Sequence, residues 1–190
     1  METVKTTRYT YADYRKLDVD DPYQYELING ELVKKSVPSP QHQMILVNLI
    51  MRVNGYVLEH KLGKVLCAPV DVFVDEYNAP QPDLLFVSTQ HLSYLTADGV
   101  FGPPDLVVEI ISPGSITRDR LDKLRLYARF GVPEYWIVDP KYRSVEVCQL
   151  TEVAGQPREY NVVSAVEESG AVQSKVLVGF TLDLADVFQA

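Results

Sequence analysis

Two acidic side chains and one lysine could form a reactive site in this chain: Asp83, Glu109 and Lys123. Glu109 is the only charged residue in the apolar run at residues 106–111, and a lone carboxylate buried there would cost several kcal/mol without a partner charge or a metal ion. Asp83 opens another apolar run, at residues 83–87. Neighbouring strands lie about 4.8 Å apart, so both carboxylates could bind one Mg²⁺ ion, which keeps positions open for water and phosphate.

Two further acids are close to these positions in the sequence. Asp71 is a candidate for a fourth member of the site. Asp105 shares a strand face with Glu109 but lies four residues away, about 13 Å along a strand. Asp105 therefore cannot bind the same ion, and we expect it to be a structural acid at the start of its strand.

Lys123 lies within a basic segment at residues 118–129. Five basic residues stand there against two acids, a local excess of three positive charges in an acidic chain: Arg118, Arg120, Lys123, Arg125 and Arg129 against Asp119 and Asp122. Such an excess attracts phosphate groups, although the arginines could instead form a solvated helix face. The apolar stripe of this helix is predicted to comprise Leu121, Leu124, Tyr127 and Ala128. Lys123 lies at the margin of this stripe, so its side chain can reach inward.

Each of the three central side chains also has a purely structural explanation. Glu109 could pair with Lys123 or with one of the arginines in a buried salt bridge. Asp83 follows a proline and could be a turn acid, and Lys123 could be a surface lysine that covers the helix edge.

The segments around these residues predict a strand, a helix and a second strand. The run at 106–111 is short, β-branched and bounded by prolines, as is typical of a core strand. A helix is expected from about residue 119 to residue 130, ending at Gly131 with Pro133 beyond it. A strand follows at 134–138. This unit predicts the crossover connection of a mixed sheet.

The N-terminal part predicts a hairpin followed by a long helix. Asn29-Gly30 is the strongest short hairpin signal, and it separates strand-like residues 25–28 and 31–33. Ser39 and Pro40 have the residue types of a helix cap and a first helical residue, and apolar residues recur at helical spacing from there up to Gly63. A short helix at 10–17 and an acidic turn at 18–22 are expected before the hairpin.

The remaining segments predict further strands. Residues 65–74 are expected to form a strand interrupted near Pro69, and residues 88–102 a short helix and a loop. Residues 144–150 and 158–163 alternate as an exposed hairpin, and a short final helix begins near Asp183.

Length and composition favour one globular domain over residues 1–190, with a core at about 25–140 and a β extension at about 141–190. The net charge of −8 argues against a protein that binds nucleic acid mainly through its overall charge. Residues 1–10 lack the apolar region of a signal peptide, no stretch reaches the length of a membrane span, and Cys67 and Cys148 lie in predicted strands. We therefore expect reduced thiols, a cytoplasmic location and no membrane partner.

The chain resembles the Uma2 family, formerly a domain of unknown function, whose bacterial members are assigned as endonucleases within the PD-(D/E)XK nuclease superfamily. The resemblance spans roughly residues 11–188. It rests on the segments YELINGEL at 25–32, SPQH at 39–42, PDLLFV at 82–87, residues 104–113, KLRLY at 123–127 and GVPEYWIVDP at 131–140.

This resemblance implies an α/β (α+β) fold of the restriction-endonuclease type: a mixed sheet flanked by helices, with an N-terminal hairpin and a C-terminal β-meander. It also implies hydrolysis of nucleic acid, DNA above all, with Mg²⁺ or Mn²⁺ bound by Asp83 and Glu109. The motif lysine would fall at Ile111, so Lys123 is expected to substitute for it.

The resemblance suggests roles for further residues. Glu26 would correspond to an additional acid near the metal, and His42 would contact a phosphate. A cross-strand pair between Glu26 and a lysine, and a plain helix-start role for His42, are the alternatives. Arg118, Arg120 and Arg125 would contact the nucleic acid.

Three functions remain after this reasoning. One is an active metal-dependent endonuclease, expected to work as a homodimer because two active sites are commonly needed to cut both strands. Another is a catalytically inactive nuclease-fold protein that binds nucleic acid or regulates another protein. The third is a purely structural dimer, for which the exposed strands after Ser144 offer an edge. No glycine-rich phosphate loop, hydrolase triad or zinc-ligand spacing indicates a different chemistry.

Overall fold

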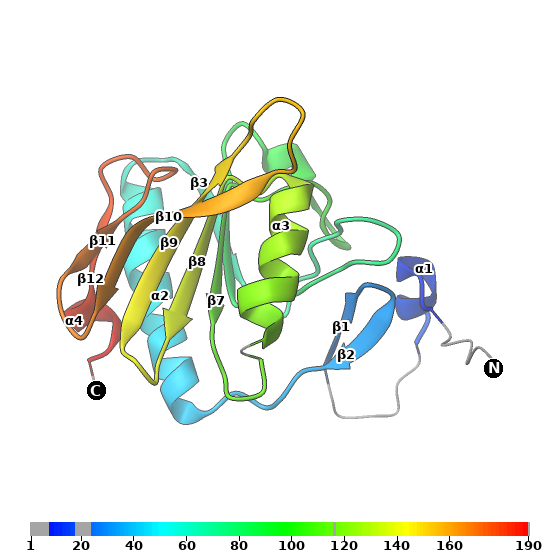
Figure 1. Cartoon of the computed structure of the whole chain (residues 1–190), viewed down its shortest axis with the longest axis horizontal. Coiled ribbons are helices and arrows are strands. Elements are labelled where there is room, and N and C mark those ends of the chain that lie inside the picture. The colour runs from blue at the N-terminus through cyan, green and yellow to red at the C-terminus, as the bar shows by residue number, and fades with distance from the viewer. Residues whose placement is uncertain (1–7, 18–23, 116, 190) are drawn as a thin grey trace.

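A six-stranded mixed β-sheet forms the centre of the molecule (Figure 1). The computed structural model describes residues 8–17, 24–115 and 117–189. The strand order is β10-β9-β8-β7-β4-β3. The strands are β3 (Gly63–Cys67), β4 (Leu84–Ser88), β7 (Leu106–Ile110), β8 (Glu134–Asp139), β9 (Ser144–Thr151) and β10 (Glu159–Glu167). The pair β7 and β8 is parallel, and the other neighbours in this sheet are antiparallel. The predicted crossover unit is therefore confirmed.

Helices cover both faces of the sheet (Figure 1). The long helix α2 (Pro40–Glu59) and the short C-terminal helix α4 (Leu184–Val187) pack on one face, together with Val108 and Ile110 of β7. The crossover helix packs on the other face, where it meets Val107 and Ile111. This alternation places Glu109 on the face of the crossover helix, as its position in the strand predicts.

The crossover helix contains two kinds of helical turn. It starts as a π-helix, η2 (Arg118–Lys123), and continues as the α-helix α3 (Leu124–Phe130). It ends at Gly131, which has a left-handed φ of 92°. The predicted end of the helix is confirmed, and the π-helical start was not predicted.

The N-terminal hairpin matches the prediction. Strands β1 (Tyr25–Ile28) and β2 (Glu31–Lys34) pair in antiparallel fashion, and Asn29 and Gly30 take the positive φ angles, 52° and 80°, that the tight turn needs. A short helix, α1 (Tyr11–Tyr14), precedes the hairpin and is capped by Thr10. The acidic turn expected at 18–22 lies outside the described residues.

The long helix α2 begins as predicted, because the Ser39 hydroxyl accepts the backbone N–H of His42 at 3.2 Å and Pro40 is the first helical residue. It ends at Glu59, and Gly63 already belongs to β3.

The strand predicted at residues 65–74 is wrong beyond Cys67. Strand β3 ends there, before the cis peptide between Ala68 and Pro69, and the following residues make only isolated bridges such as Val72 with Val100. The physical reason is that Pro69 has no N–H to donate to a ladder. Residues 88–102 contain the expected short helix, η1 (Leu92–Tyr94), and also a small hairpin of β5 (Leu95–Thr96) and β6 (Gly99–Val100).

Residues 174–176 of the C-terminal extension are attached to the sheet through one buried carboxylate, that of Glu134 at the start of β8. Its Oε1 accepts hydrogen bonds from Trp136 Nε1 and Ser174 Oγ, both at 2.7 Å. Its Oε2 accepts the backbone N–H groups of Lys175 at 2.6 Å and Val176 at 3.1 Å. The extension also contains the paired strands β11 (Ala171–Gln173) and β12 (Thr181–Asp183). As predicted, Asp183 caps the final helix.

Other predictions about the chain concern thiols and membranes. Cys67 and Cys148 lie in β3 and β9 and are free, as expected. Within the described ranges, no helix has both the length and the apolar character needed to cross a bilayer.

Two glycines in helices predict opposite effects on stability. Gly131→Ala should lower the free energy of unfolding by about 1–2 kcal/mol, because alanine is strained at a left-handed φ; its Cβ would also lie 2.8 Å from Arg158 Nη1. Gly55→Ala, within α2, meets no atom within 4 Å and should raise the free energy of unfolding by up to about 1 kcal/mol. Urea denaturation of both variants measures this difference in sign. Equal effects would show that backbone conformation at Gly131 is unimportant.

Candidate active site

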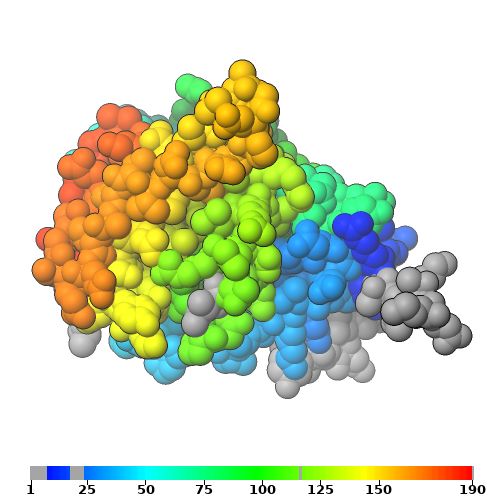
Figure 2. All heavy atoms as spheres, viewed as in Figure 1, coloured from blue at the N-terminus to red at the C-terminus, as the bar shows by residue number. Residues whose placement is uncertain are grey.

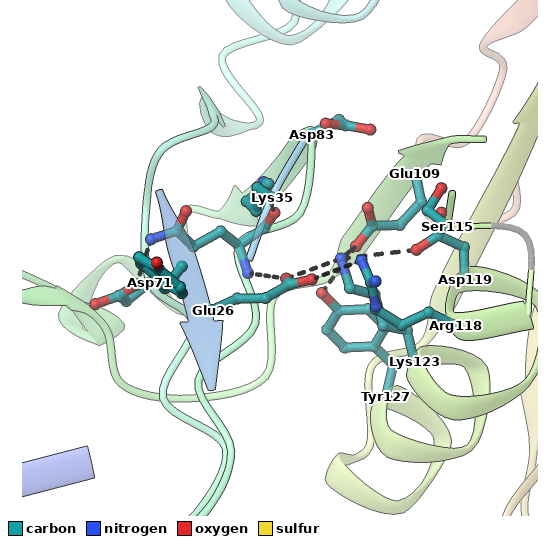
Figure 3. Close-up of polar contacts among 12 residues, drawn as sticks. Glu26, Lys35, Asp71, Asp83, Glu109, Ser115, Arg118, Asp119, Lys123 and Tyr127 are labelled. Carbon is teal, nitrogen blue, oxygen red and sulfur yellow. Dashed lines mark hydrogen bonds and ion pairs between the residues drawn. The ribbon is translucent and has the colours of Figure 1, made fainter. Parts of the chain in front are cut away.

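A buried ammonium group, that of Lys123, lies at the centre of the candidate site (Figure 3). Lys123 Nζ donates a hydrogen bond to Glu109 Oε1 at 2.8 Å and lies 3.0 Å from Glu26 Oε2 and 3.8 Å from Asp119 Oδ1. All four side chains are at most 4% exposed. The Tyr127 hydroxyl donates to the same oxygen of Glu109 at 3.2 Å. We call Glu26, Glu109, Asp119 and Lys123 the Lys123 cluster.

Three separate elements contribute to this cluster. Glu26 comes from β1, Glu109 from β7, and Asp119 and Lys123 from the π-helical turn. Figure 2 shows the hairpin segment packed against the crossover helix on this face of the molecule. The hairpin thus covers the cluster, which explains why the side chains of Glu109, Asp119 and Lys123 are buried.

The π-helical turn decides which residues of the crossover helix face inward. Leu121, predicted for the apolar stripe, is 48% exposed, whereas Asp119 and Lys123 are buried. A π-helix has wider turns than an α-helix, because its hydrogen bonds span five residues rather than four. The inward face therefore shifts relative to an α-helical projection of the sequence, which explains the wrong prediction for Leu121.

The Lys123 cluster has more negative than positive charge. Three buried carboxylates surround one ammonium group, and Arg118 adds a cation at the rim, with its Nη1 3.6 Å from Glu26 Oε1. Burial raises the pKa of Glu109 well above its usual range, and the nearby Asp119, Asp83 and Glu26 raise it further against the opposing effect of Lys123.

The pKa shifts of Lys123 and Glu26 both favour their charged forms. Burial would lower the pKa of Lys123, but Glu109, Glu26 and Asp119 outweigh it and hold this pKa above its usual range. Burial would raise the pKa of Glu26, but Lys123, Lys35 and the N–H of Gln81 lower it overall. Glu26 and Lys123 are therefore an ionised pair. Burial also raises the pKa of Asp119, so Glu109 and Asp119 are the groups of the cluster that are poised to take up a proton.

Asp83 lies directly before β4, beside the cluster. The register pairs Leu84 with Val108, and one further step places Asp83 opposite Glu109. Asp83 Oδ2 accepts the N–H of Ile110 at 2.8 Å and lies 3.3 Å from His42 Nε2. Despite burial, these contacts and Lys123 lower the pKa of Asp83. The structure thus brings Glu109 and Lys123 into contact, whereas among the described residues Asp83 contacts Ile110 and His42 and neither Glu109 nor Lys123.

Carboxylate oxygens are the ligand type that a hard divalent cation prefers. The described part of the chain holds no group of three or more His, Cys, Asp or Glu side chains that could hold a metal ion. Two carboxylates are nevertheless sufficient where water and phosphate complete the coordination of Mg²⁺. Glu26 Oε1 is buried and accepts no hydrogen bond from a described residue, although Arg118 Nη1 lies 3.6 Å from it. Asp83 and Glu109 are the residues that would hold the ion.

The position of the motif lysine is filled by an apolar side chain. Ile111 is 6% exposed and packs with Val107 and Tyr127 in the core on the α3 side. An ammonium group reaches Glu109 instead from Lys123, on the adjacent helix, as predicted.

The arginines predicted to contact nucleic acid have different surroundings. Arg118 pairs with Glu26, and Arg125 is exposed without an ion pair among the described residues. Arg120 is bound to Glu146 at 2.7 Å and to Asp139 at 3.5 Å. The charge of Arg120 is therefore compensated within the protein.

The two additional acids lie outside the Lys123 cluster. Asp71 Oδ1 contacts the Tyr14 hydroxyl at 3.2 Å and Gln81 Nε2 at 2.9 Å. Asp105 accepts the N–H of Ser88 at 2.7 Å and lies 3.0 Å from His91 Nδ1, in keeping with a structural role.

The sequence reasoning missed Asp119 and Gln81. Asp119 was counted only as an acid among basic residues, although its spacing of four from Lys123 is a signal for a helical ion pair. Gln81, whose N–H donates to Glu26 Oε2 at 3.2 Å, has no signal in the sequence because its segment has no regular structure.

Comparisons with known proteins show the family and the fold of the chain. Residues 11–185 match a family model described as "Uma2: Putative restriction endonuclease". A crystal structure described as a "putative nuclease belonging to DUF820" from Anabaena variabilis is similar with a TM-score of 0.73 and 18% sequence identity, and the match covers 94% of this chain and 97% of that chain. This likeness shows that the two share a fold. A search of curated proteins finds no match.

Proposed function

Since the chain belongs to the Uma2 family, we propose that it is a Mg²⁺-dependent endonuclease that hydrolyses phosphodiester bonds of DNA. Mn²⁺ would serve as an alternative ion. The observation that carries this proposal is the approach of Lys123 Nζ to within 3.0 Å of two carboxylates from separate strands, Glu26 and Glu109, beside Asp83. A solvated helix lysine or a simple turn acid would not account for this convergence.

Each residue has a distinct role in the proposed reaction. When bound, the metal ion would polarise the scissile phosphate and acidify a water molecule. Asp83, which stays ionised because its pKa is lowered, and Glu109 would hold that ion. Lys123 would donate a hydrogen bond to the phosphate oxygen on which negative charge develops. Glu26 keeps Lys123 protonated and oriented, and His42 fixes the carboxylate of Asp83.

Glu109→Gln should abolish cleavage while the fold is retained, because glutamine has the same shape but is a neutral and weaker metal ligand. We expect a loss of at least about 10²–10³-fold in the cleavage rate, as for loss of a preorganised electrostatic contact. The measurement is conversion of supercoiled plasmid, and separately of single-stranded DNA and RNA, with Mg²⁺ or Mn²⁺. Thermal unfolding with Mn²⁺ gives an independent readout, since an ion that binds only the folded state raises Tm.

The matched control is Glu59→Gln, the same change at an exposed position near the end of α2. This variant should cut and bind Mn²⁺ like the wild type. Cleavage that persists in Glu109→Gln, or that proceeds equally in excess chelator, would contradict the proposal.

A catalytically inactive binding or regulatory module is the second candidate. It is favoured by Ile111 in the lysine position and by the closed contact of Glu109 with Lys123, which could be a structural ion pair. Nucleic-acid binding by the wild type without cleavage of any substrate would support this second candidate. Metal-dependent cleavage lost in Glu109→Gln would exclude it.

We further propose that the protein acts as a homodimer, because one centre cuts one strand at a time. Strand β10 is an edge of the sheet, and Val162 and Val163 on it are 56% and 40% exposed. Val162→Lys should therefore shift sedimentation towards a monomer, and Val178→Lys, at an exposed position outside the sheet, should not. A monomeric wild type would contradict the dimer.

The free thiols of Cys67 and Cys148 support the proposed action in the cytoplasm.

A further inference from the structure

A second lysine, Lys35, lies beside the Lys123 cluster on the side of the hairpin. Lys35 directly follows β2, and its backbone N–H donates to the carbonyl oxygen of Gln24 at 2.8 Å, so the hairpin fixes its position. Its Nζ donates to the carbonyl oxygen of Gln81 at 2.9 Å. Unlike the side chains of the Lys123 cluster, Lys35 is only partly buried.

The backbone of Gln81 places Lys35 between two acids of the candidate site. Gln81 accepts a hydrogen bond from Lys35 through its carbonyl oxygen and donates its N–H to Glu26 Oε2 at 3.2 Å, and Asp83 follows two residues later in the chain. Figure 3 shows Lys35 between the side chains of Glu26 and Asp83. Against the effect of burial, Lys123 and then Lys35 lower the pKa of Glu26. Lys35 therefore belongs to the electrostatic environment of the site.

The ammonium group of Lys35 has donors to spare, in contrast to the other cations near Glu26. Lys123 Nζ is surrounded by three carboxylates, and Arg118 pairs with Glu26. No carboxylate oxygen of a described residue lies within 4.0 Å of Lys35 Nζ. An ammonium group carries three N–H donors, and the carbonyl oxygen of Gln81 takes one of them. Two donors of Lys35 therefore remain for a bound group.

A bound group with phosphates would need such a cation at this place. Glu26 and Asp83, whose pKa values are both lowered, stay ionised and repel the phosphates of nucleic acid. Lysine binds phosphate as a compact point charge at the end of a flexible side chain. Among the described cations near Glu26, Lys35 is the one that is partly exposed and not already held by a carboxylate.

We propose that Lys35 binds a backbone phosphate of the substrate strand and thereby positions that strand against the candidate active site. The contact carries no base preference, because phosphate contacts fix the register of a strand and do not read its sequence. This inference rests on the proposed nuclease function, since it names a further residue that holds the substrate of that reaction. The alternative is a purely structural lysine, which caps the carbonyl group of Gln81 and helps to keep Glu26 ionised.

The salt dependence of DNA binding distinguishes a phosphate contact from a structural one. The full-length Glu109→Gln protein is titrated without metal against fluorescein-labelled single-stranded and duplex DNA, at about 50 to 200 mM salt. Each phosphate contact contributes about 0.7 for single strands, and about 0.9 for duplex DNA, to the slope of log affinity against log salt concentration. Adding Lys35→Met should make the slope shallower by these amounts. The affinity lost at about 50 mM salt should then exceed the loss at about 200 mM by about threefold.

Two matched variants control for other effects of the change. Lys35→Arg keeps the charge and should keep the slope, because the contact is electrostatic. Lys64→Met removes a lysine from an exposed position of β3 and should leave the slope unchanged. Lys64 pairs with Val87, which lies four residues from Asp83, about 13 Å along the strand. A purely structural Lys35 would lower the free energy of unfolding in Lys35→Met, which urea denaturation measures, without changing the slope.

Acetylation of lysines tests the same contact in the wild-type protein, so the inference stays falsifiable even if Lys35→Met does not fold. With a chelator present, saturating single-stranded DNA should slow the acetylation of Lys35 and leave that of Lys64 unchanged, as mass spectrometry measures. An unchanged slope in a folded Lys35→Met protein, or equal acetylation of Lys35 with and without DNA, would overturn the inference even if the protein cuts DNA. A shallower slope with a protected Lys35, in a protein that cuts nothing, would support the contact and reject the nuclease.

Discussion

Replacing Lys123 by methionine lowers the free energy of unfolding by about 3–5 kcal/mol, because it leaves the buried carboxylates of the cluster without their central cation. It also lowers any cleavage rate by about 10²–10³-fold, since the donor to the phosphate is lost. Urea denaturation measures the first effect and plasmid cleavage the second. Arg125→Met, at an exposed position of the same helix, should change the free energy of unfolding by less than about 0.5 kcal/mol.

The pH dependence of the stability of Lys123→Met follows from Glu109. The pKa of Glu109 in the folded protein is already raised by burial, and loss of Lys123 raises this pKa further. The folded state then holds a proton that the unfolded state has lost, so stability falls as pH rises from the ordinary glutamate pKa towards the raised one. The destabilisation should therefore be smaller at about pH 5 than at about pH 8.

A double variant distinguishes an electrostatic cause of the destabilisation by Lys123→Met from a packing defect. Glu109→Gln combined with Lys123→Met removes both partners of the 2.8 Å contact and should be more stable than Lys123→Met alone. If the double variant is less stable than the single one at every pH, the stabilising effect of Lys123 is not the neutralisation of Glu109.

Glu134→Gln should lower the free energy of unfolding by about 2–4 kcal/mol, since its amide NH₂ would face two hydrogen-bond donors whichever way it is turned. Both carboxylate oxygens of Glu134 now accept two hydrogen bonds each, and the residue is fully buried. Urea denaturation measures the loss. Hydrogen exchange at the amides of Lys175 and Val176 should become faster before the sheet itself opens.

The control for this prediction is Glu159→Gln, the same change at an exposed position of β10. Its free energy of unfolding should stay within about 0.5 kcal/mol of the wild type. A Glu134→Gln protein as stable as the control would show that the C-terminal extension is held by its apolar contacts alone.

Local rules predicted the elements that have strong local signals. The Asn29-Gly30 turn, the Ser39 cap and the glycine at the end of the crossover helix each impose a backbone conformation that neighbouring residues do not alter. The Glu109 strand was likewise predictable, because an apolar β-branched run between prolines has few other conformations.

Features set by tertiary contacts could not be predicted in the same way. The π-helical start of the crossover helix carries the buried Asp119 and Lys123, and a helical projection of the sequence assumes α-helical geometry throughout. The end of β3 at Cys67 and the attachment of residues 174–176 to Glu134 also involve partners that are remote in sequence. Glu26, Glu109 and Lys123 were predicted as candidates, whereas Asp119 on the π-helical turn and Gln81 on an irregular segment were missed.

The position of Glu26 in the hairpin has a consequence for synthesis of the protein. A nascent chain that has emerged from the ribosome only as far as β4 contains Glu26 and Asp83 but lacks β7 and Lys123. Burial of the Glu26 carboxylate requires the ammonium group of Lys123. The hairpin therefore gains its electrostatic partner only after residue 123 has emerged. The centre therefore cannot assemble before residue 123 is made, and a truncated product that stops earlier would carry Glu26 without its ammonium partner.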